Sequence, residues 1–214
     1  MCGESYFQTR KERSAFFSTP MLHAPVLTVS DSRFNSLSDT VTPQGIMAIC
    51  EKRIYTFSDF PTESPFLFIG ERLSDPGNIG TLIRTAAAAG VSGVILSTGS
   101  GDIYNPKTIR ASAGAILRIP VIENANLNEI IPMLTKQGVT ILAAHLQGAV
   151  LPYNLDLRQG LGVLIGNEAN GLSAEVSKLA HIRVKLPMAP DIESLNASVA
   201  GGILFYEVVR QRLM

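Results

Sequence analysis

The chain lacks tryptophan, has only two cysteines among its 214 residues and carries no excess charge of either sign. Eighteen basic side chains balance eighteen acidic ones, so no global positive field attracts nucleic acid, although a local patch or a dimer groove can still bind RNA. Cys2 and Cys50 lack the spacing of a metal site, and the sequence predicts none. Two reduced thiols are typical of a cytosolic protein.

Long apolar runs are also missing. No stretch approaches the roughly 20 residues that span a membrane, and the polar N-terminus is not typical of a signal peptide. We therefore expect a cytoplasmic protein with no membrane contact. With 46% hydrophobic and 17% charged residues, the chain is long enough to form one good core and at most a small appendage.

A turn-rich stretch over residues 58–65 divides the chain. The preceding residues 1–57 show little regular pattern before residue 22. They then predict a strand at Val26–Val29, a helix at Ser32–Leu37 and a strand at Ile46–Cys50. This is too little for an independent domain. We expect a segment that packs on the main body or is the remnant of a larger domain.

Residues 66–214 alternate between apolar strands and helical patterns. Strands are predicted at 66–69, 93–96, 116–122, 139–144, 161–165 and 182–186. Helices are predicted at 78–89, from 105 onward, and at 127–136, 173–179 and 194–213. Such alternation predicts an α/β fold in which helices cover both faces of a mainly parallel sheet.

Three separate segments, 70–86, 164–172 and 186–200, place glycines and polar residues at the ends of apolar runs. Polar residues beside tight turns at strand ends are where open α/β sheets bind ligands. The sequence therefore predicts one site assembled from all three segments. No Gly-x-Gly-x-x-Gly or Gly-Lys-Ser/Thr phosphate loop occurs, and no histidine, cysteine or serine forms a pattern typical of metal binding or nucleophilic catalysis.

The polar residues in these segments also have plainer interpretations. Arg84 lies on a largely apolar helix, where it either forms a structural ion pair or points at a specific ligand. Asn78 suits a helix cap. Glu168 suits a cap for the helix at Ser173 or a partner for Arg84. Ser194 suits the N-cap of the final helix, whose first turn holds Asn196.

The three segments, in this order and at these separations, resemble the three motifs of the SpoU-type RNA ribose 2′-O-methyltransferases of the SPOUT class. The matching cores run from Asn78 to Ala86, from Ile165 to Leu172 and from Pro187 to Ala200. One departure is Ala169, where the family usually has glycine. Residues 23–53 resemble the end of the family's N-terminal RNA-recognition domain, so residues 1–57 are interpreted as a shortened form of it.

The resemblance implies a C-terminal trefoil knot, S-adenosylmethionine as cofactor, a homodimer, and ribosomal or transfer RNA as substrate. It implies catalytic roles for Asn78, Arg84, Glu168, Ser194 and Asn196. It also implies cofactor contacts at positions that follow the predicted strands: Ala144, His145, Leu146, Gly166, Leu186, Met188 and Leu195.

The implied chemistry suits these residue types. A ribose hydroxyl must lose its proton as it attacks the sulfonium methyl group, and Arg84 is the family's proposed base. Because a guanidinium stays protonated, an RNA phosphate assists it or Arg84 only orients the hydroxyl. Two rivals remain: a non-catalytic RNA-binding protein of the same fold, which would not need Arg84 or Asn196, and a dinucleotide-binding oxidoreductase, whose glycine fingerprint is missing.

The final helix bears on assembly. Leu195, Val199, Ile203 and Tyr206 recur at helical spacing, which is typical of core packing or of a subunit interface. The resemblance favours the interface and hence the dimer.

Overall fold

The computed structural model describes residues 2–7, 25–147 and 150–214, and the chain divides into two compact units, Met1–Ile54 and Tyr55–Met214. The predicted linker at 58–65 follows this boundary and includes part of a 3-10 turn, Phe57–Asp59. The linker therefore groups with the second unit. No helix in the described ranges is long and apolar enough to cross a membrane.

The first unit is a small sheet with one helix. Its elements are β1 (Cys2–Phe7), β2 (Val26–Leu27), α2 (Asp31–Leu37) and β3 (Ile46–Cys50). β1 lies in the centre, parallel to β2 and antiparallel to β3. β1 was not predicted from the sequence, and the strand predicted at Val26–Val29 is shorter in the structure, Val26–Leu27. Much of the chain before residue 25 lies outside the described residues.

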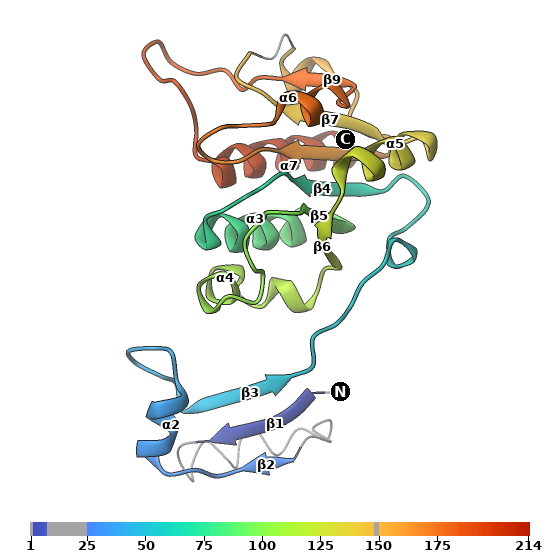
Figure 1. Ribbon diagram of the computed structural model, residues 1–214. Helices are drawn as coiled ribbons and strands as arrows, with labels where there is room; N and C mark the ends of the chain where they lie inside the picture. Colours follow the sequence, from blue (N-terminus) through green and yellow to red (C-terminus); the bar gives the residue numbers. More distant parts are fainter. Residues whose placement is uncertain (1, 8–24, 148–149) are drawn as a thin grey trace. The chain divides into compact units, whose positions relative to one another are not determined.

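The second unit is built on a six-stranded sheet in the order β6-β5-β4-β8-β7-β9, with every neighbouring pair parallel (Figure 1). The strands are β4 (Phe66–Gly70), β5 (Gly93–Ser97), β6 (Val121–Ala125), β7 (Thr140–Ala144), β8 (Leu161–Ile165) and β9 (Ile182–Val184). The carboxyl ends of parallel strands meet at one edge. The three polar segments follow β4, β8 and β9, so they meet there too.

Helices cover both faces of this sheet, as predicted. The helices are α3 (Pro76–Ala88), α4 (Pro106–Ser112), α5 (Leu127–Lys136), α6 (Ala174–Lys178) and α7 (Ala197–Leu213). Side chains alternate between faces along each strand. Phe66 and Phe68 of β4 therefore pack with α3 and α7, whereas Leu67 and Ile69 pack with α5 and α6.

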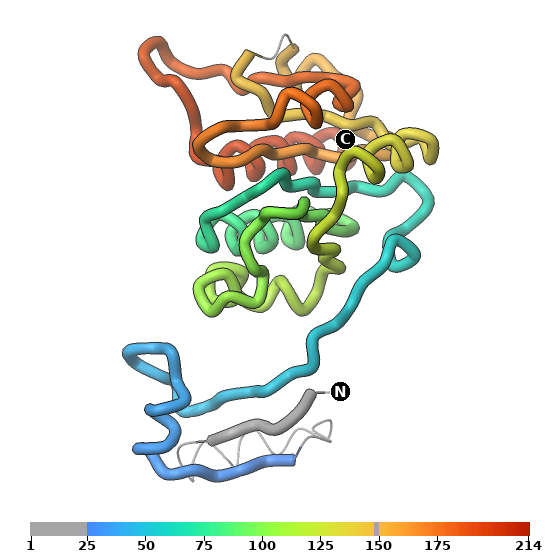
Figure 2. The backbone as a smooth tube through the Cα atoms, in the orientation of Figure 1, coloured from blue at the N-terminus to red at the C-terminus, as the bar shows by residue number. Residues whose placement is uncertain are grey.

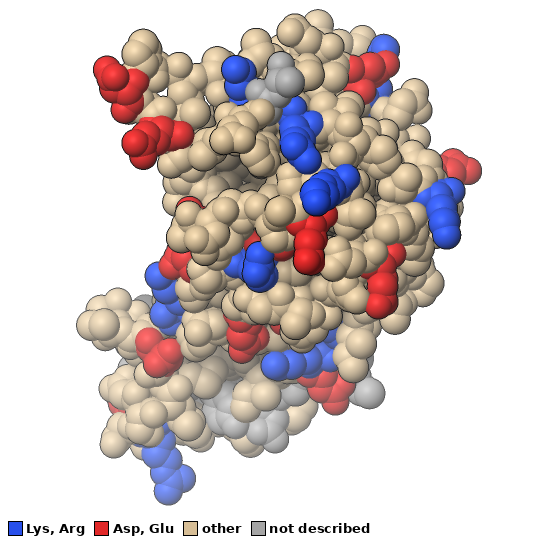
Figure 3. All heavy atoms as spheres, turned by 45° about the horizontal axis from the view of Figure 1, so that its top comes forward, with Lys and Arg blue, Asp and Glu red and all other residues tan. Residues whose placement is uncertain are grey.

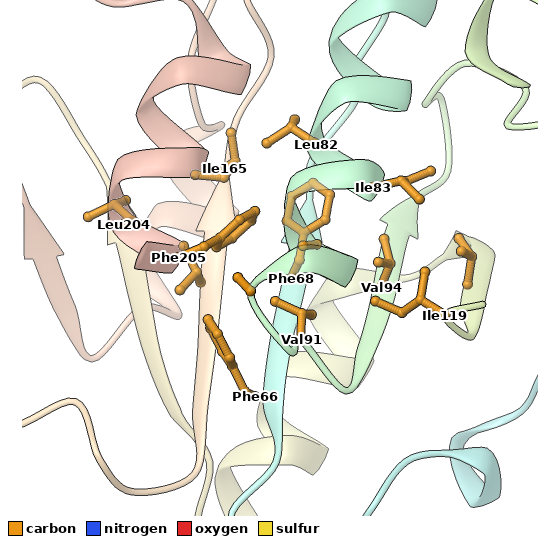
Figure 4. Packing of buried hydrophobic residues seen from close by; sticks show 14 of the residues in the cluster. Phe66, Phe68, Leu82, Ile83, Val91, Val94, Ile119, Ile165, Leu204 and Phe205 are labelled. Carbon is orange, nitrogen blue, oxygen red and sulfur yellow. The ribbon is translucent and has the colours of Figure 1, made fainter. Parts of the chain in front are cut away.

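The α7 side of the core is centred on aromatic contacts. The Phe205 ring of α7 meets the ring of Phe68 edge-on at 5.4 Å and that of Phe66 at 6.1 Å (Figure 4). At the far end of the helix, Gln211 accepts a hydrogen bond from the Leu157 N–H (2.9 Å), and Arg212 donates to the Gln159 carbonyl (2.8 Å). One face of α7 is thereby fixed to the sheet.

Several predicted boundaries were wrong. The predicted strand at 116–122 is in fact a 3-10 turn, Ala115–Leu117, followed by β6, which begins after Pro120 because proline cannot donate in a strand ladder. β9 ends at Val184, and α7 begins at Ala197 instead of Ser194. The chain between β9 and α7 forms a long loop (Figure 2). The threading that defines a trefoil knot stays a prediction.

The glycine of the first motif permits close helix packing. A Cβ atom added to Gly80 of α3 would lie 2.5 Å from the Thr108 carbonyl oxygen and 2.6 Å from Ala111 Cβ, both on α4. Backbone atoms cannot rotate away as a flexible side chain can. The sequence motif therefore needs glycine here so that α3 can rest on α4.

We expect Gly80→Ala to destabilise the fold by about 1–3 kcal/mol, the usual cost of overpacking a core. Gly202→Ala is the matched control, because its added Cβ would meet only Thr85 Cγ2, at an ordinary 3.5 Å. Chemical denaturation of both variants and the parent measures the difference. Equal stability of Gly80→Ala and parent would show that α4 moves away without cost.

Candidate active site

A cavity of about 480 Å³ lies at the carboxyl ends of β7, β8 and β9. Its walls combine apolar side chains with backbone of the strand ends and the loops that follow them. All seven residues predicted to contact a cofactor line this cavity: Ala144, His145, Leu146, Gly166, Leu186, Met188 and Leu195. Glu168 and Ser194 line it as well. The structure thus brings together most of the residues selected from three segments.

One wall is a tight loop that follows β8. Asn167 and Gly171 exchange two backbone hydrogen bonds, of 3.0 and 2.9 Å, and Gly171 has a φ of 66°, in the left-handed region. A Cβ atom on Gly166 would overlap the backbone of Gly171 and Leu172. Glycine at position 166 therefore lets the loop fold back against its own strand.

Glu168 accepts hydrogen bonds from the loop before α3. Its oxygens accept from the Ser74 N–H (3.1 Å), the Ser74 hydroxyl (3.0 Å) and the Asp75 N–H (3.2 Å). Burial alone would raise the pKa of this carboxyl. Hydrogen bonds from backbone N–H groups and from the Asn78 side chain outweigh burial and lower its pKa below the ordinary 4.5. Glu168 is therefore ionised at neutral pH.

Asn78 and Asn196 extend this connection to the third segment. Asn78 Nδ2 donates to Glu168 Oε1 (3.2 Å), and Asn196 Nδ2 donates to Asn78 Oδ1 (2.9 Å). Asn196 Oδ1 in turn accepts from the backbone N–H and the hydroxyl of Ser198. Side chains from positions 78, 168 and 196 thus form one hydrogen-bonded chain.

The predicted capping roles of Asn78, Ser194 and Glu168 were wrong, because other residues cap these helices. Asn78 does not cap α3, because Asp75 does so by accepting from the Asn78 N–H at 2.8 Å. Ser194 does not cap α7, because Asn196 does. Glu168 neither caps α6 nor pairs with Arg84. Freed from the cap, the Asn78 side chain is available to bind Glu168.

Arg84 lies apart from this group. Its side chain is exposed on α3, and it lines a different hollow together with Ser92, Ser112 and Arg118. Among the residues that the structure describes, neither a hydrogen bond nor an ion pair of Arg84 is seen. The structure therefore gives Arg84 no ion-pair partner among the described residues, and Arg84 does not line the cavity that holds Glu168.

Two residues that matter were not selected from the sequence. Asn167 Nδ2 donates to the Arg72 carbonyl (2.7 Å), which ties the loop after β8 to the segment after β4. Glu71 is buried and accepts from the Ser173 N–H (2.8 Å), the position that Glu168 was expected to serve. A carboxylate directly after a fully buried strand was the available signal for Glu71. Within the described ranges, no group of three His, Cys, Asp or Glu side chains suits a metal.

The comparisons with known proteins agree with this geometry. The model of the SpoU rRNA Methylase family matches residues 65–206. The chain belongs to the SpoU rRNA methylase family. This confirms the resemblance found in the motifs, and the match covers the whole six-stranded sheet and its helices up to the middle of α7.

Relatives and solved structures of the family are similar over most of the chain. An uncharacterised tRNA/rRNA methyltransferase of Synechocystis is 35% identical over 86% of this chain and 67% of its own length. The 23S rRNA (guanosine(2553)-2′-O)-methyltransferase RlmP of Bacillus subtilis is 33% identical over 84% of this chain and 71% of its own. The crystal structure of an AdoMet-bound rRNA methyltransferase from Sinorhizobium meliloti superposes with a TM-score of 0.87 at 31% identity, covering all of this chain and 81% of that one.

The lowered pKa of Glu168 leads to a prediction on acid stability. A carboxyl with a lowered pKa in the folded state stabilises the fold above its ordinary pKa of 4.5, and that contribution is lost as the pH falls through the lowered value. We expect Glu168→Gln to be less stable than the parent at pH 7, with the gap closing below pH 4.5. Urea unfolding at several pH values measures it. The exposed carboxylate Glu193, replaced by Gln, serves as control, and a gap for Glu168→Gln that stays constant with pH would contradict the prediction.

Proposed function

We propose that this protein transfers the methyl group of S-adenosylmethionine to a ribose 2′-hydroxyl of ribosomal or transfer RNA. The observation that carries the proposal is the hydrogen-bonded chain of Glu168, Asn78 and Asn196 at the mouth of a cavity built from three strand ends. A purely RNA-binding protein of this fold has no need for that assembly. We also propose a cytoplasmic location, because the relatives from Synechocystis and Bacillus subtilis are bacterial proteins that act on ribosomal or transfer RNA.

The cavity suits the cofactor in size and lining. Its volume falls in the usual range of about 300–1,000 Å³ for small-molecule sites. Leu186, Leu195 and Leu204 supply apolar walls for an adenosine ring, and the backbone near Gly166 and His145 supplies hydrogen-bonding groups. When bound there, S-adenosylmethionine supplies the reactive methyl group on its sulfonium. The protein holds the cofactor in position for the reaction.

The charged and polar residues then divide the remaining tasks. Ionised Glu168 fixes the loop before α3 through hydrogen bonds to its backbone, and Asn196 fixes the start of α7 against Asn78. Ser194 lies on the cavity wall, where we propose that it contacts the substrate. Arg84 orients the ribose hydroxyl, or moves its proton with help from an RNA phosphate, since a guanidinium stays protonated.

A homodimer accounts for the position of Arg84. α7 buries Gly201, Leu204, Phe205 and Val208 against the sheet but leaves Val199, Ile203 and Tyr206 exposed along its opposite face. Covering that face with a second copy removes an apolar stripe from water. Because Arg84 does not line the cavity of its own chain, we propose that it serves the cavity of the partner.

RNA contacts must be local on this protein. The face shown in Figure 3 mixes basic and acidic side chains instead of gathering one sign. We propose that the first unit, with its three-stranded sheet, takes part in RNA recognition, as the resemblance implies for residues 1–57. The RNA is identified by mapping ribose methylation in ribosomal and transfer RNA from cells with and without the gene. The proposed function would be overturned by two results together: methylation maps that are identical with and without the gene, and no methyl transfer in vitro to RNA from cells that lack the gene.

We expect S-adenosylmethionine and its demethylated product to bind with micromolar affinity, about 8 kcal/mol. Gly166→Ala should bind at least about tenfold more weakly, because the loop that forms the cavity wall has to move. Isothermal titration calorimetry measures both. Absence of heat with either compound, together with clear binding of a nicotinamide dinucleotide, would favour the oxidoreductase instead.

We expect Arg84→Ala to lower methyl transfer by at least about 100-fold, the usual scale for a positioned proton-transfer group, with cofactor affinity changed only a few-fold. Mixed dimers test the partner role. In a dimer of Arg84→Ala with Gly166→Ala, one cavity keeps an intact Gly166 loop and receives Arg84 from the other copy, so transfer should return. The assay is run at a cofactor concentration well below the dissociation constant of the Gly166→Ala cavity. If each copy used its own Arg84, the mixed dimer would then show no more transfer than the Gly166→Ala protein alone. Failure of two differently tagged copies to co-purify would contradict the dimer.

A further inference from the structure

A second hollow, of about 580 Å³, opens at the carboxyl ends of β4, β5 and β6, beside the starts of α5 and α6. It differs from the cofactor cavity in chemistry. Glu71, Arg72 and Glu175 are the charged residues on its wall, and Thr98 and Asn128 add uncharged hydrogen-bonding groups. None of these side chains lines the cofactor cavity.

Arg72 is held in an uncommon conformation at the edge of this hollow. Its φ of 48° lies in the left-handed region, which a non-glycine residue seldom adopts. Two hydrogen bonds keep the backbone there: the Arg72 N–H donates to Ser97 Oγ (2.8 Å), and the Arg72 carbonyl accepts from Asn167 (2.7 Å). The surrounding structure thus fixes the point from which the side chain projects.

The guanidinium of Arg72 is exposed to solvent, but an ion pair with Glu71 restrains it. Its Nη2 lies 3.4 Å from Oε1 of Glu71, whose side chain is only 6% exposed, while the Arg72 side chain is 54% exposed. Because Glu71 Oε2 already accepts from Ser173, the buried carboxylate is anchored on one side and holds the guanidinium on the other. The ion pair therefore places a planar cation at the wall of the hollow with about half of its side chain open to solvent.

This hollow adjoins the cofactor cavity. The loop from Gly166 to Leu172 lines the cofactor cavity, and the next residues, Ser173 to Val176, line the second hollow. The hydrogen bond between Asn167 and Arg72 joins the two walls. The chain from Gly166 to Val176 thus forms part of the wall of both hollows, at the same edge of the sheet.

The lining favours an uncharged group with hydrogen-bonding edges. Two carboxylates and one guanidinium repel a phosphate more than they attract it. A guanidinium plane stacks on a nucleobase, and exposed Asn and Thr side chains bind base edges, which is how proteins read unpaired RNA. We propose that the hollow around Arg72 binds an unpaired nucleobase of the RNA substrate next to the reacting ribose, an inference that rests on the proposed function.

The test compares single-stranded RNA octamers with abasic octamers that keep the same phosphates. Fluorescence anisotropy measures their binding to the full chain saturated with S-adenosylmethionine. We expect Arg72→Gly, which suits the left-handed backbone, to weaken binding of the base-bearing octamer by about tenfold and that of the abasic octamer by no more than about twofold. Arg158→Gly is the matched control, because the Arg158 side chain is also more than half exposed, at 64% against 54% for Arg72, and pairs with nearby Asp156 at 2.8 Å.

Asn128→Ala provides a second variant in case Arg72→Gly does not fold. The Asn128 N–H donates to Asn126, so the side chain can be removed without breaking the helix cap. We expect it to weaken base-bearing octamers by about threefold, the usual effect of one hydrogen bond. Equal loss for both octamers would assign Arg72 to a phosphate instead. If binding is unchanged in both variants while the parent still transfers methyl groups, the base site alone is overturned. If binding depends on the base but the parent transfers no methyl group, the proposed function alone is overturned.

Discussion

The carboxylate of Glu168 is the interaction on which the site depends. It accepts from two backbone N–H groups before α3 and from Asn78, which in turn accepts from Asn196. Three segments that are about 90 and 30 residues apart in sequence are thereby held at one edge of the sheet. Hydrogen bonds to a charged group contribute about 1.5–3 kcal/mol each, so loss of this one carboxylate loosens all three.

The parallel sheet makes that junction possible. Since all six strands run in one direction, their carboxyl ends deliver the loops after β4, β8 and β9 to the same edge, and the loops after β5 and β6 to the adjoining hollow. Glycines at Gly80 and Gly166 then allow backbone to approach backbone where a Cβ has no room. The fold thus needs glycine at these motif positions for packing, whether or not a ligand also needs it there.

The α/β class and the two covered faces could be predicted from periodicity. The resemblance to the SpoU-type methyltransferases selected residues that the structure brings to the wall of one cavity. The roles of Asn78, Glu168 and Ser194 could not be predicted. A sequence shows that an Asn or a Ser stands near a helix start, but which residue caps depends on where the backbone turns. Here Asp75 and Asn196 cap α3 and α7, which leaves the Asn78 side chain for the network and Ser194 on the cavity wall.

By itself the sequence determined most elements of the second unit, the covering of both sheet faces and the family, because these depend on local periodicity and on short motifs. Only the tertiary structure decided which partners meet. It paired Glu71, not Glu168, with the start of α6, held Arg72 at a positive φ between Ser97 and Asn167, and left Arg84 outside the cavity of its own chain. Those contacts join residues 25 to 102 positions apart, and a hydrogen bond over such a separation depends on the path of the whole chain.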